Sequence, residues 1–386
     1  MKLLRNLAAV LLAVAASGCS TPLGDYYDRW FGSDPAIKPA ELVALKATAT
    51  AKLLWQGGVG SAERFVFSPL LAETAVVATG VNGQMTRFDP VSGKTLTRID
   101  VKAALSGGVG GNDNMMVVGT PKGEIFAYDV AGKMLWKAQI SSDVLGAPQI
   151  EQGVVVVRAG DGRLFGLDAA TGARKWVYQR TLPPLTLRTH VTVKPYRGAI
   201  FAGFPGGRLV AVSAANGNLI WEATVALPKG TTELERVADV LSVPVTDGRQ
   251  VCAAAYQGRG ACFGVLKGEL LWARDFSSIS GLAMDTLGVY AADEKSAVVV
   301  FDRSSGASLW KQDKLYGRNV TAPALAGRFI AVGDLQGFVH FLSREDGSFV
   351  ARLPTDGSPI VAQPVSLDDY VIVQTLKGGV FAMAIQ

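Results

Sequence analysis

Few residues in this sequence have the types and spacing that enzymatic chemistry needs. The two histidines, His190 and His340, stand far apart in the chain, and neither has Cys, His or Asp neighbours at metal-ligand spacing. The chain also lacks the Gly-x-Ser-x-Gly motif of hydrolases and the Gly-x-x-x-x-Gly-Lys phosphate loop. We therefore predict no catalytic residue, no metal site, no cofactor site and no enzymatic activity.

Four aspartates recur at equivalent places, each three or four residues before a glycine; they are Asp89, Asp129, Asp168 and Asp302. This pattern is typical of turns in which the aspartate accepts backbone hydrogen bonds and the glycine adopts a positive φ. Equivalent turns of a repeat are held apart by its symmetry. These carboxylates therefore cannot converge as an acid–base pair.

The first cysteine belongs to an export signal. Lys2 and Arg5 precede an apolar stretch, Leu7 to Ala16, that is too short to span a membrane. Small residues then lead to Cys19, and this order resembles a bacterial lipobox. We predict that residues 1–18 are a lipoprotein signal peptide and that Cys19 is acylated; an ordinary signal peptide cut nearby is the alternative.

The residues after Cys19 have no repeat character, and we assign residues 19–50 to the lipidated N-terminus and a tether. Ser20, rather than Asp, follows the cysteine, which favours sorting to the outer membrane. Removal of residues 1–18 takes away two basic residues, so the net charge becomes 36 − 33 = +3. No run of Lys and Arg with interleaved aromatics remains, and we predict no nucleic-acid partner.

The other two cysteines, Cys252 and Cys262, flank a stretch with the composition of a hairpin turn. The exported compartment is oxidising, and cysteines opposite each other on a hairpin can form a disulfide. Only the strand register decides between a bridge and two small buried apolar side chains. Both alternatives stay open.

Residues 51–386 consist of repeats that position all these residues. Each unit has an apolar β-branched run, a glycine, an alternating segment, the Asp-containing turn and a last strand. In most units this last strand carries a Trp at the same position of the repeat, which we call the slot. Eight slots recur at a mean spacing of about (351 − 55)/7, or 42 residues, which is the blade length of a β-propeller. The slot residues are Trp55, Thr97, Trp136, Trp176, Trp221, Trp272, Trp310 and Ala351.

The two ends of the repeat region complement each other. The segment around Trp55 is an outer strand without inner strands, and the last unit stops before its outer strand. We therefore predict an all-β, eight-bladed β-propeller of four-stranded antiparallel blades, closed by an N-terminal strand that completes the last blade. Seven blades are the alternative, because the unit near Ala261 departs from the consensus. Tryptophans at a fixed slot are expected to pack between blades.

Two connections are longer than the period requires. The distances from Trp176 to Trp221 (221 − 176 = 45) and from Trp221 to Trp272 (272 − 221 = 51) place the extra residues at 178–188 and 227–241. Consecutive junctions of a propeller emerge side by side on one face, where binding loops usually lie. The two loops carry an apolar pair and nearby charges: Leu185, Leu187, Arg188, Glu235, Arg236 and Asp239. We predict a protein-binding surface; a tolerated insertion is the alternative.

The consensus Asp-x-x-x-Gly-x-x-x-Trp resembles the repeats of pyrroloquinoline-quinone enzymes, which bind quinone and calcium. The lipobox, the tether and the segments 184–188 and 230–240 are more similar to the BamB family, lipoproteins of the outer-membrane β-barrel assembly (BAM) machinery. The resemblance covers essentially the whole chain. The family often has a second Asp two residues after the first, where this chain has Leu241, so we expect the partner contact to rely more on apolar packing.

This resemblance implies a function. It implies a non-catalytic scaffold on the periplasmic face of the outer membrane that binds a POTRA domain of BamA and assists the insertion of outer-membrane proteins. Unfolded outer-membrane proteins are a further class of partner. The partner-binding residues carried over are Leu185, Leu187, Arg188, Arg236 and Asp239. The alternatives are a quinone-dependent dehydrogenase and a periplasmic propeller that binds a ligand in its channel.

Overall fold

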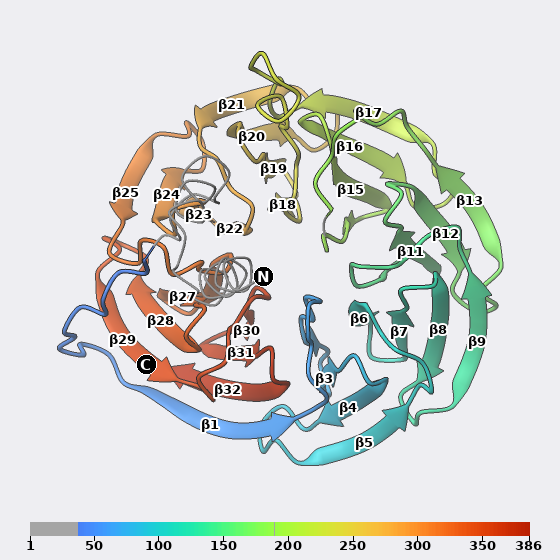
Figure 1. Ribbon diagram of the computed structural model, residues 1–386, viewed down its shortest axis with the longest axis horizontal. Helices are drawn as coiled ribbons and strands as arrows, with labels where there is room; N and C mark the ends of the chain where they lie inside the picture. Colours follow the sequence, from blue (N-terminus) through green and yellow to red (C-terminus); the bar gives the residue numbers. More distant parts are fainter. Residues whose placement is uncertain (1–37, 189) are drawn as a thin grey trace, which may run out of the picture. The chain divides into compact units, whose positions relative to one another are not determined.

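The computed structural model describes residues 38–188 and 190–386, and from residue 40 onward they form a closed ring of β-sheets (Figure 1). Eight four-stranded antiparallel sheets are the blades; in seven of them the strands follow the chain from the centre outward, and in the eighth the outermost strand comes from the start of the repeat region. The period-42 pattern therefore predicts the fold correctly. Eight blades are confirmed and seven are wrong, since the degenerate unit near Ala261 forms a complete blade.

The strands of the first four blades are as follows. Blade 1 contains β2 (Leu70–Leu71), β3 (Val76–Thr79), β4 (Gln84–Phe88) and β5 (Thr95–Asp100). Blade 2 contains β6 (Gly107–Gly111), β7 (Met115–Gly119), β8 (Glu124–Asp129) and β9 (Met134–Gln139). Blade 3 contains β10 (Gln149–Glu151), β11 (Val154–Arg158), β12 (Leu164–Asp168) and β13 (Arg174–Tyr178). Blade 4 contains β14 (Lys194–Tyr196), β15 (Ala199–Phe204), β16 (Arg208–Ser213) and β17 (Leu219–Thr224).

The remaining blades follow in the same order. Blade 5 contains β18 (Val245–Thr246), β19 (Gln250–Ala254), β20 (Arg259–Gly264) and β21 (Leu270–Asp275). Blade 6 contains β22 (Gly281–Met284), β23 (Gly288–Ala292), β24 (Val298–Asp302) and β25 (Ser308–Gln312). Blade 7 contains β26 (Ala324–Ala326), β27 (Phe329–Gly333), β28 (Phe338–Ser343) and β29 (Phe349–Pro354). Blade 8 contains β30 (Val365–Leu367), β31 (Tyr370–Gln374), β32 (Gly379–Ile385) and β1 (Ala51–Gly58).

Blade 8 closes the ring with strands from both ends of the repeat region. Strand β1 pairs antiparallel with β32, from Ala51 opposite Ile385 to Gly58 opposite Gly379. The first and last segments of the ring are therefore hydrogen-bonded neighbours, as the complementary ends predict. This pairing covers the edge of β32 that the last unit would otherwise expose.

Residues 40–50, which the sequence groups with the tether, are attached to the ring. The Ala40 amide donates to the Tyr316 carbonyl at 2.9 Å, and the Arg318 guanidinium donates to the Ala40 carbonyl at 2.9 Å. The Thr48 amide donates to the Val350 carbonyl at 3.0 Å. The predicted signal peptide and Cys19 lie outside the described residues. Within the described residues, no helix is long and apolar enough to cross a bilayer.

The tryptophan slot connects each blade to the next. Each indole Nε1 donates to a backbone carbonyl in the turn between the third and fourth strands of the following blade, at 2.8–2.9 Å. The glycine of that turn lies under the indole ring: a Cβ on Gly217 would lie 2.6 Å from Cε3 of Trp176. The acceptors are the carbonyls of Pro90, Ala169, Ala214, Val265, Arg303 and Arg344. The turn glycine and the Trp are therefore two halves of one inter-blade contact.

The two slots without Trp have separate physical explanations. At the Thr97 slot, Arg87 of the adjacent strand donates from Nη1 to the Val130 carbonyl at 2.8 Å, which replaces the indole hydrogen bond. At the Ala351 slot, the following blade has no turn between its outer strands, because β1 comes from the other end of the chain. A Trp at that slot would have no turn glycine to cover.

A disulfide joins Cys252 and Cys262 in the structure. Cys252 on β19 and Cys262 on β20 stand directly opposite each other, with a Cα–Cα distance of 4.0 Å. Both side chains are buried in the contact between blades 5 and 6. The register, which the sequence alone does not give, places the two thiols within bonding reach.

Gly217→Ala tests the inter-blade contact, and Gly153→Ala is its matched control. Both glycines have a positive φ, of 72° and 75°, but a Cβ on Gly153 would meet no atom within 4 Å. The control should lose only about 1–2 kcal/mol of unfolding free energy for left-handed backbone. Gly217→Ala should lose at least about 2 kcal/mol more, because the methyl group displaces the Trp176 ring. Urea unfolding measures both; equal losses would contradict the contact.

The Cys252→Ala/Cys262→Ala double variant tests the disulfide. The bridge closes a loop with a sequence separation of 10, and its loss should lower the unfolding free energy by about 2–3 kcal/mol through the greater entropy of the unfolded chain. The measurement is urea unfolding under oxidising and reducing conditions. Reductant should reduce the stability of the wild type and leave the double variant unchanged. A wild type that reductant does not affect, with both thiols titratable after unfolding, would mean that no bridge forms.

Candidate partner-binding site

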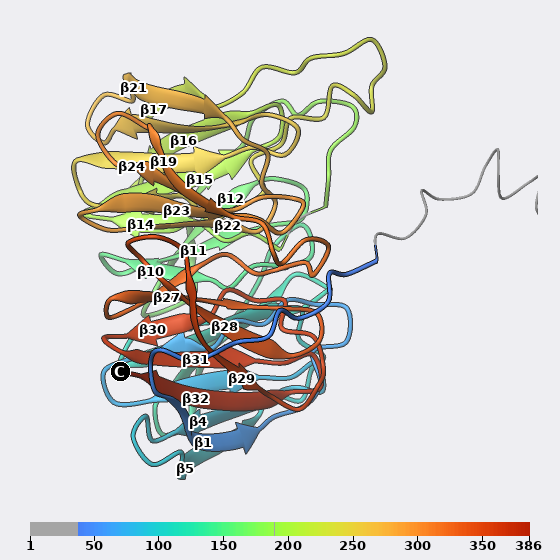
Figure 2. The same cartoon turned by 90° about the vertical axis from the view of Figure 1, so that its left-hand side faces the viewer.

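The two long connections leave the same face of the ring. They run from residue 179 to 193, between β13 and β14, and from 225 to 244, between β17 and β18. These loops contain 15 and 20 residues, whereas the other six outer-to-inner connections contain 5 to 11. Both long loops project beyond the blades, on the right in Figure 2. We call them loop A (179–193) and loop B (225–244).

Asp239 of loop B holds the two loops together. Its Oδ2 accepts a hydrogen bond from the Leu187 amide of loop A at 2.8 Å, and its Oδ1 accepts from the Gly206 amide at 3.0 Å. Its own carbonyl accepts from the Tyr256 amide at 2.9 Å. The residue is only 1% exposed. The structure therefore places Asp239 inside the site as a positioning residue, rather than on the predicted binding surface.

The tip of loop B is shaped by Glu235. Its Oε2 accepts from the amides of Thr231 and Thr232 at 2.9 and 3.1 Å, and from the Thr231 hydroxyl at 3.1 Å. The backbone hydrogen bonds from Thr232 and Thr231 lower the pKa of this exposed carboxyl to about 2. Arg236 follows with an exposed side chain, whose Nη1 lies 3.9 Å from Oε1 of Glu233. Glu235 therefore folds the loop tip, and Arg236 remains available at the surface.

Loop A presents the predicted apolar pair. Leu185 and Leu187 are 42% and 38% exposed, although the backbone amide of Leu187 donates a hydrogen bond to Asp239 of loop B. The Arg188 side chain is 73% exposed, and its guanidinium pairs with Asp143 from the connection between blades 2 and 3. The structure thus gathers two leucines and a cation on one loop. Leu241, at the position of the family's second Asp, is half-buried.

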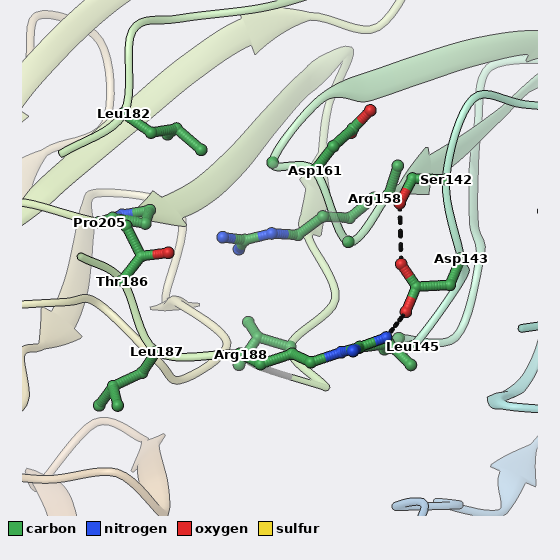
Figure 3. A pocket seen from close by; sticks show the side chains of 15 residues that line it. Ser142, Asp143, Leu145, Arg158, Asp161, Leu182, Thr186, Leu187, Arg188 and Pro205 are labelled. Atoms are coloured by element: carbon green, nitrogen blue, oxygen red, sulfur yellow. Dashed lines mark hydrogen bonds and ion pairs between the residues drawn. The ribbon is translucent and has the colours of Figure 1, made fainter. Parts of the chain in front are cut away.

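A cavity of about 320 Å³ opens beside loop A, between the connections of blades 2, 3 and 4 (Figure 3). Thr186, Leu187 and Arg188 form one wall, and the aliphatic side chain of Leu182 contributes another part of the lining. Arg158, the last residue of β11, extends its guanidinium into the cavity. This arginine and Asp143 were not among the predicted site residues. A charged residue ending the apolar run Val154–Val157 is the signal that could have found Arg158.

His340 has a structural role. Its Nε2 lies 2.8 Å from Oδ2 of Asp334, and its Nδ1 accepts a hydrogen bond from Nε of Arg352 at 3.1 Å. Since a guanidinium only donates, Nδ1 carries no proton and Nε2–H donates to Asp334. Burial lowers the pKa of His340, consistent with the neutral ring. Both ring nitrogens of His340 are therefore engaged by Asp334 and Arg352.

Residues 38–188 and 190–386 contain no group of three or more His, Cys, Asp or Glu side chains that could hold a metal ion. They therefore do not fit the calcium of the quinone enzymes that the repeats resemble. The repeated aspartates are used in their own turns: Asp168, for example, accepts from the Thr171 amide and hydroxyl at 3.0 and 2.9 Å.

Comparison with known proteins relates the chain to one family. The family model described as outer membrane protein assembly factor BamB matches residues 81–312. A Nitrosomonas eutropha protein with that name is 44% identical over 97% of this chain and 93% of its own length. A Bordetella pertussis protein of the same name is 42% identical over 95% of this chain and 93% of its own length.

Solved structures share the fold. The crystal structure of BamB from Moraxella catarrhalis superposes with a TM-score of 0.79 at 24% identity, covering 87% of this chain and 100% of that one. The quinohemoprotein alcohol dehydrogenase of Comamonas testosteroni superposes with a TM-score of 0.69 at 13% identity, covering 86% of this chain and 76% of that one. At these identities the likeness shows the eight-bladed propeller alone. The family model and the near full-length relatives show more, namely that this chain belongs to the BamB family of outer membrane protein assembly factors.

Proposed function

We propose that this chain is a non-catalytic scaffold lipoprotein of the BAM complex that binds a periplasmic POTRA domain of BamA through loops A and B. The observation that carries the proposal is the hydrogen bond from the Leu187 amide to Asp239, which joins loop A to loop B next to the exposed side chains of Leu185, Leu187 and Arg188. A surface of this kind needs little ordering when a partner binds, so less of the interaction energy is lost. Binding in this way would assist the folding and insertion of outer-membrane proteins.

The chemistry of the surface suits a folded protein partner. Two partly exposed leucines provide apolar area on loop A, and Arg188 and Arg236 are exposed cations on loops A and B. Interfaces of moderate size combine such an apolar centre with a polar rim, and a few central residues dominate the affinity. The exposed positive charges favour a partner surface that carries acidic residues.

The membrane anchor is a separate part of the proposal. Acylation of Cys19 after removal of residues 1–18 would attach the chain to the periplasmic face of the outer membrane, the membrane that the relatives' names mention. More than one acyl chain gives stable anchoring, whereas a single chain binds only marginally. The anchor would keep loops A and B at high local concentration near BamA.

Arg188→Glu should abolish co-purification of BamA with this protein from detergent-solubilised envelopes. The substitution reverses the exposed charge and places a carboxylate beside Asp143, which is 12% exposed at its side chain. Arg98→Glu, the same charge change at an exposed position of the outer strand β5, is the control and should leave BamA bound. Circular dichroism and thermal melting should show an intact propeller in both variants. Unchanged co-purification with Arg188→Glu would refute the assignment of loop A.

Asp239→Asn should release loop A although Asp239 itself is buried. The amide group replaces one of the two acceptor oxygens, so the N–H of either Leu187 or Gly206 loses its partner, at a cost of about 1–3 kcal/mol in local stability. Hydrogen exchange at the Leu187 and Gly206 amides should become faster, and BamA binding should weaken. Asp275→Asn, the same chemical change at an exposed position of the outer strand β21, is the control. Unchanged protection of both amides would show that Asp239 does not position the loop.

A further inference from the structure

Arg158 is a buried cation whose guanidinium is incompletely bound. The residue is 7% exposed, and its Nη1 is buried without a hydrogen-bond partner. Its guanidinium lies in the cavity beside loop A, among Leu182, Thr186 and Pro205 (Figure 3). An unpaired donor of this kind costs free energy in a folded protein unless a ligand or partner satisfies it.

The carboxylates around this guanidinium are already bound within the chain. Asp143 pairs with Arg188, and Asp161 lies 3.4 Å from the Arg163 guanidinium and accepts from a serine hydroxyl. Asp239 accepts two backbone hydrogen bonds, as described above. Among the described residues, no carboxylate lies within ion-pairing distance of the Arg158 nitrogens.

The cation persists at neutral pH. Burial lowers the pKa of Arg158 to about 10, while the negative charge of Asp239 opposes that shift. The Phe204 ring lies 5.2 Å from Cζ of Arg158 and gives partial compensation on one face of the guanidinium. A ring face does not accept the in-plane N–H groups, and these are the groups that a carboxylate binds in pairs.

We propose that the cavity receives an acidic side chain of the protein partner, whose carboxylate pairs with Arg158 when the partner docks on loops A and B. This inference rests on the proposed function and adds the chemistry of one anchor to it. Thr186 and Leu187 belong both to the cavity wall and to loop A, so the cavity is continuous with the surface that presents Leu185. Leu145, Leu182 and Pro205 offer apolar contacts for the methylene groups of a glutamate.

Arg158→Met in the full-length, detergent-purified protein tests the anchor by titration with purified BamA. Loss of one partner of a buried charge pair should weaken the affinity at least about 30-fold. The melting temperature should stay the same or rise, because Met removes an unpaired buried charge and keeps the volume. Arg174→Met at an exposed position of β13, outside the cavity lining, is the control and should bind BamA like the wild type.

A double-mutant cycle identifies the acidic residue of BamA that enters the cavity. Single Glu→Gln and Asp→Asn substitutions in the BamA POTRA domains should include one that weakens binding to the wild type but not to Arg158→Met. Arg158→Lys should bind with intermediate affinity, because it keeps the charge and loses the planar pair of donors. Leu182→Trp, which fills the cavity and leaves Arg158 and residues 185–188 unchanged, should also weaken binding, so the test holds even if Arg158→Met does not fold.

The outcomes separate the two proposals. Wild-type affinity in Arg158→Met and Leu182→Trp, with binding lost in Arg188→Glu, would overturn the anchor and leave the proposed function intact. A wild type that does not bind BamA would overturn both. If inorganic phosphate raised the melting temperature of the wild type but not of Arg158→Met, and BamA affinity were the same in both, the cavity would be a phosphate site and the anchor would be wrong.

Discussion

The contact between an indole ring and the turn glycine of the next blade is the constraint on which the ring depends. Trp176 shows its parts: the ring covers Gly217 and Nε1 donates to the Ala214 carbonyl. Each contact fixes the outer strand of one blade against a turn of its neighbour, and such contacts join six of the eight pairs of adjacent blades. Arg87 supplies the hydrogen bond between blades 1 and 2, and backbone pairing of β1 with β32 closes the ring.

This constraint explains why most of the fold could be predicted from the sequence. Because the contact needs a glycine in the turn and a Trp in the preceding blade, both residue types recur periodically in the sequence. This pattern is kept even in degenerate units such as the one near Ala261. The exceptions needed the structure. Arg87 replaces the indole hydrogen bond across a strand pair, which depends on register. Ala351 faces a blade whose outer strands are not joined in sequence, so no turn exists there.

The candidate site was predictable in place but only partly in detail. The lengths of loops A and B, measured against the period, locate the face, and Leu185, Leu187 and Arg188 are exposed there as their types suggest. The inward direction of Asp239 was not predictable, because an aspartate in a polar loop binds solvent or a backbone amide with equal ease. The direction of the Asp239 side chain depends on the amide of Gly206, which lies in blade 4 and donates to Oδ1. Tertiary placement, rather than local sequence, decides that role.

The inward direction of Asp239 also connects the two parts of the site. Its negative charge opposes the effect of burial on Arg158, while its oxygens bind the Leu187 amide and so set the wall of the cavity that Arg158 enters. The same carboxylate therefore shapes the apolar surface and helps to keep the cation charged. It accepts hydrogen bonds from the Leu187 and Gly206 amides, and among the described residues it forms no ion pair with Arg158. A rigid ring can tolerate such an unpaired cation, since its stability comes from repeated contacts elsewhere. The rule that buried charges are paired is thus broken at Arg158, where the carboxylate of a partner would supply the missing pair.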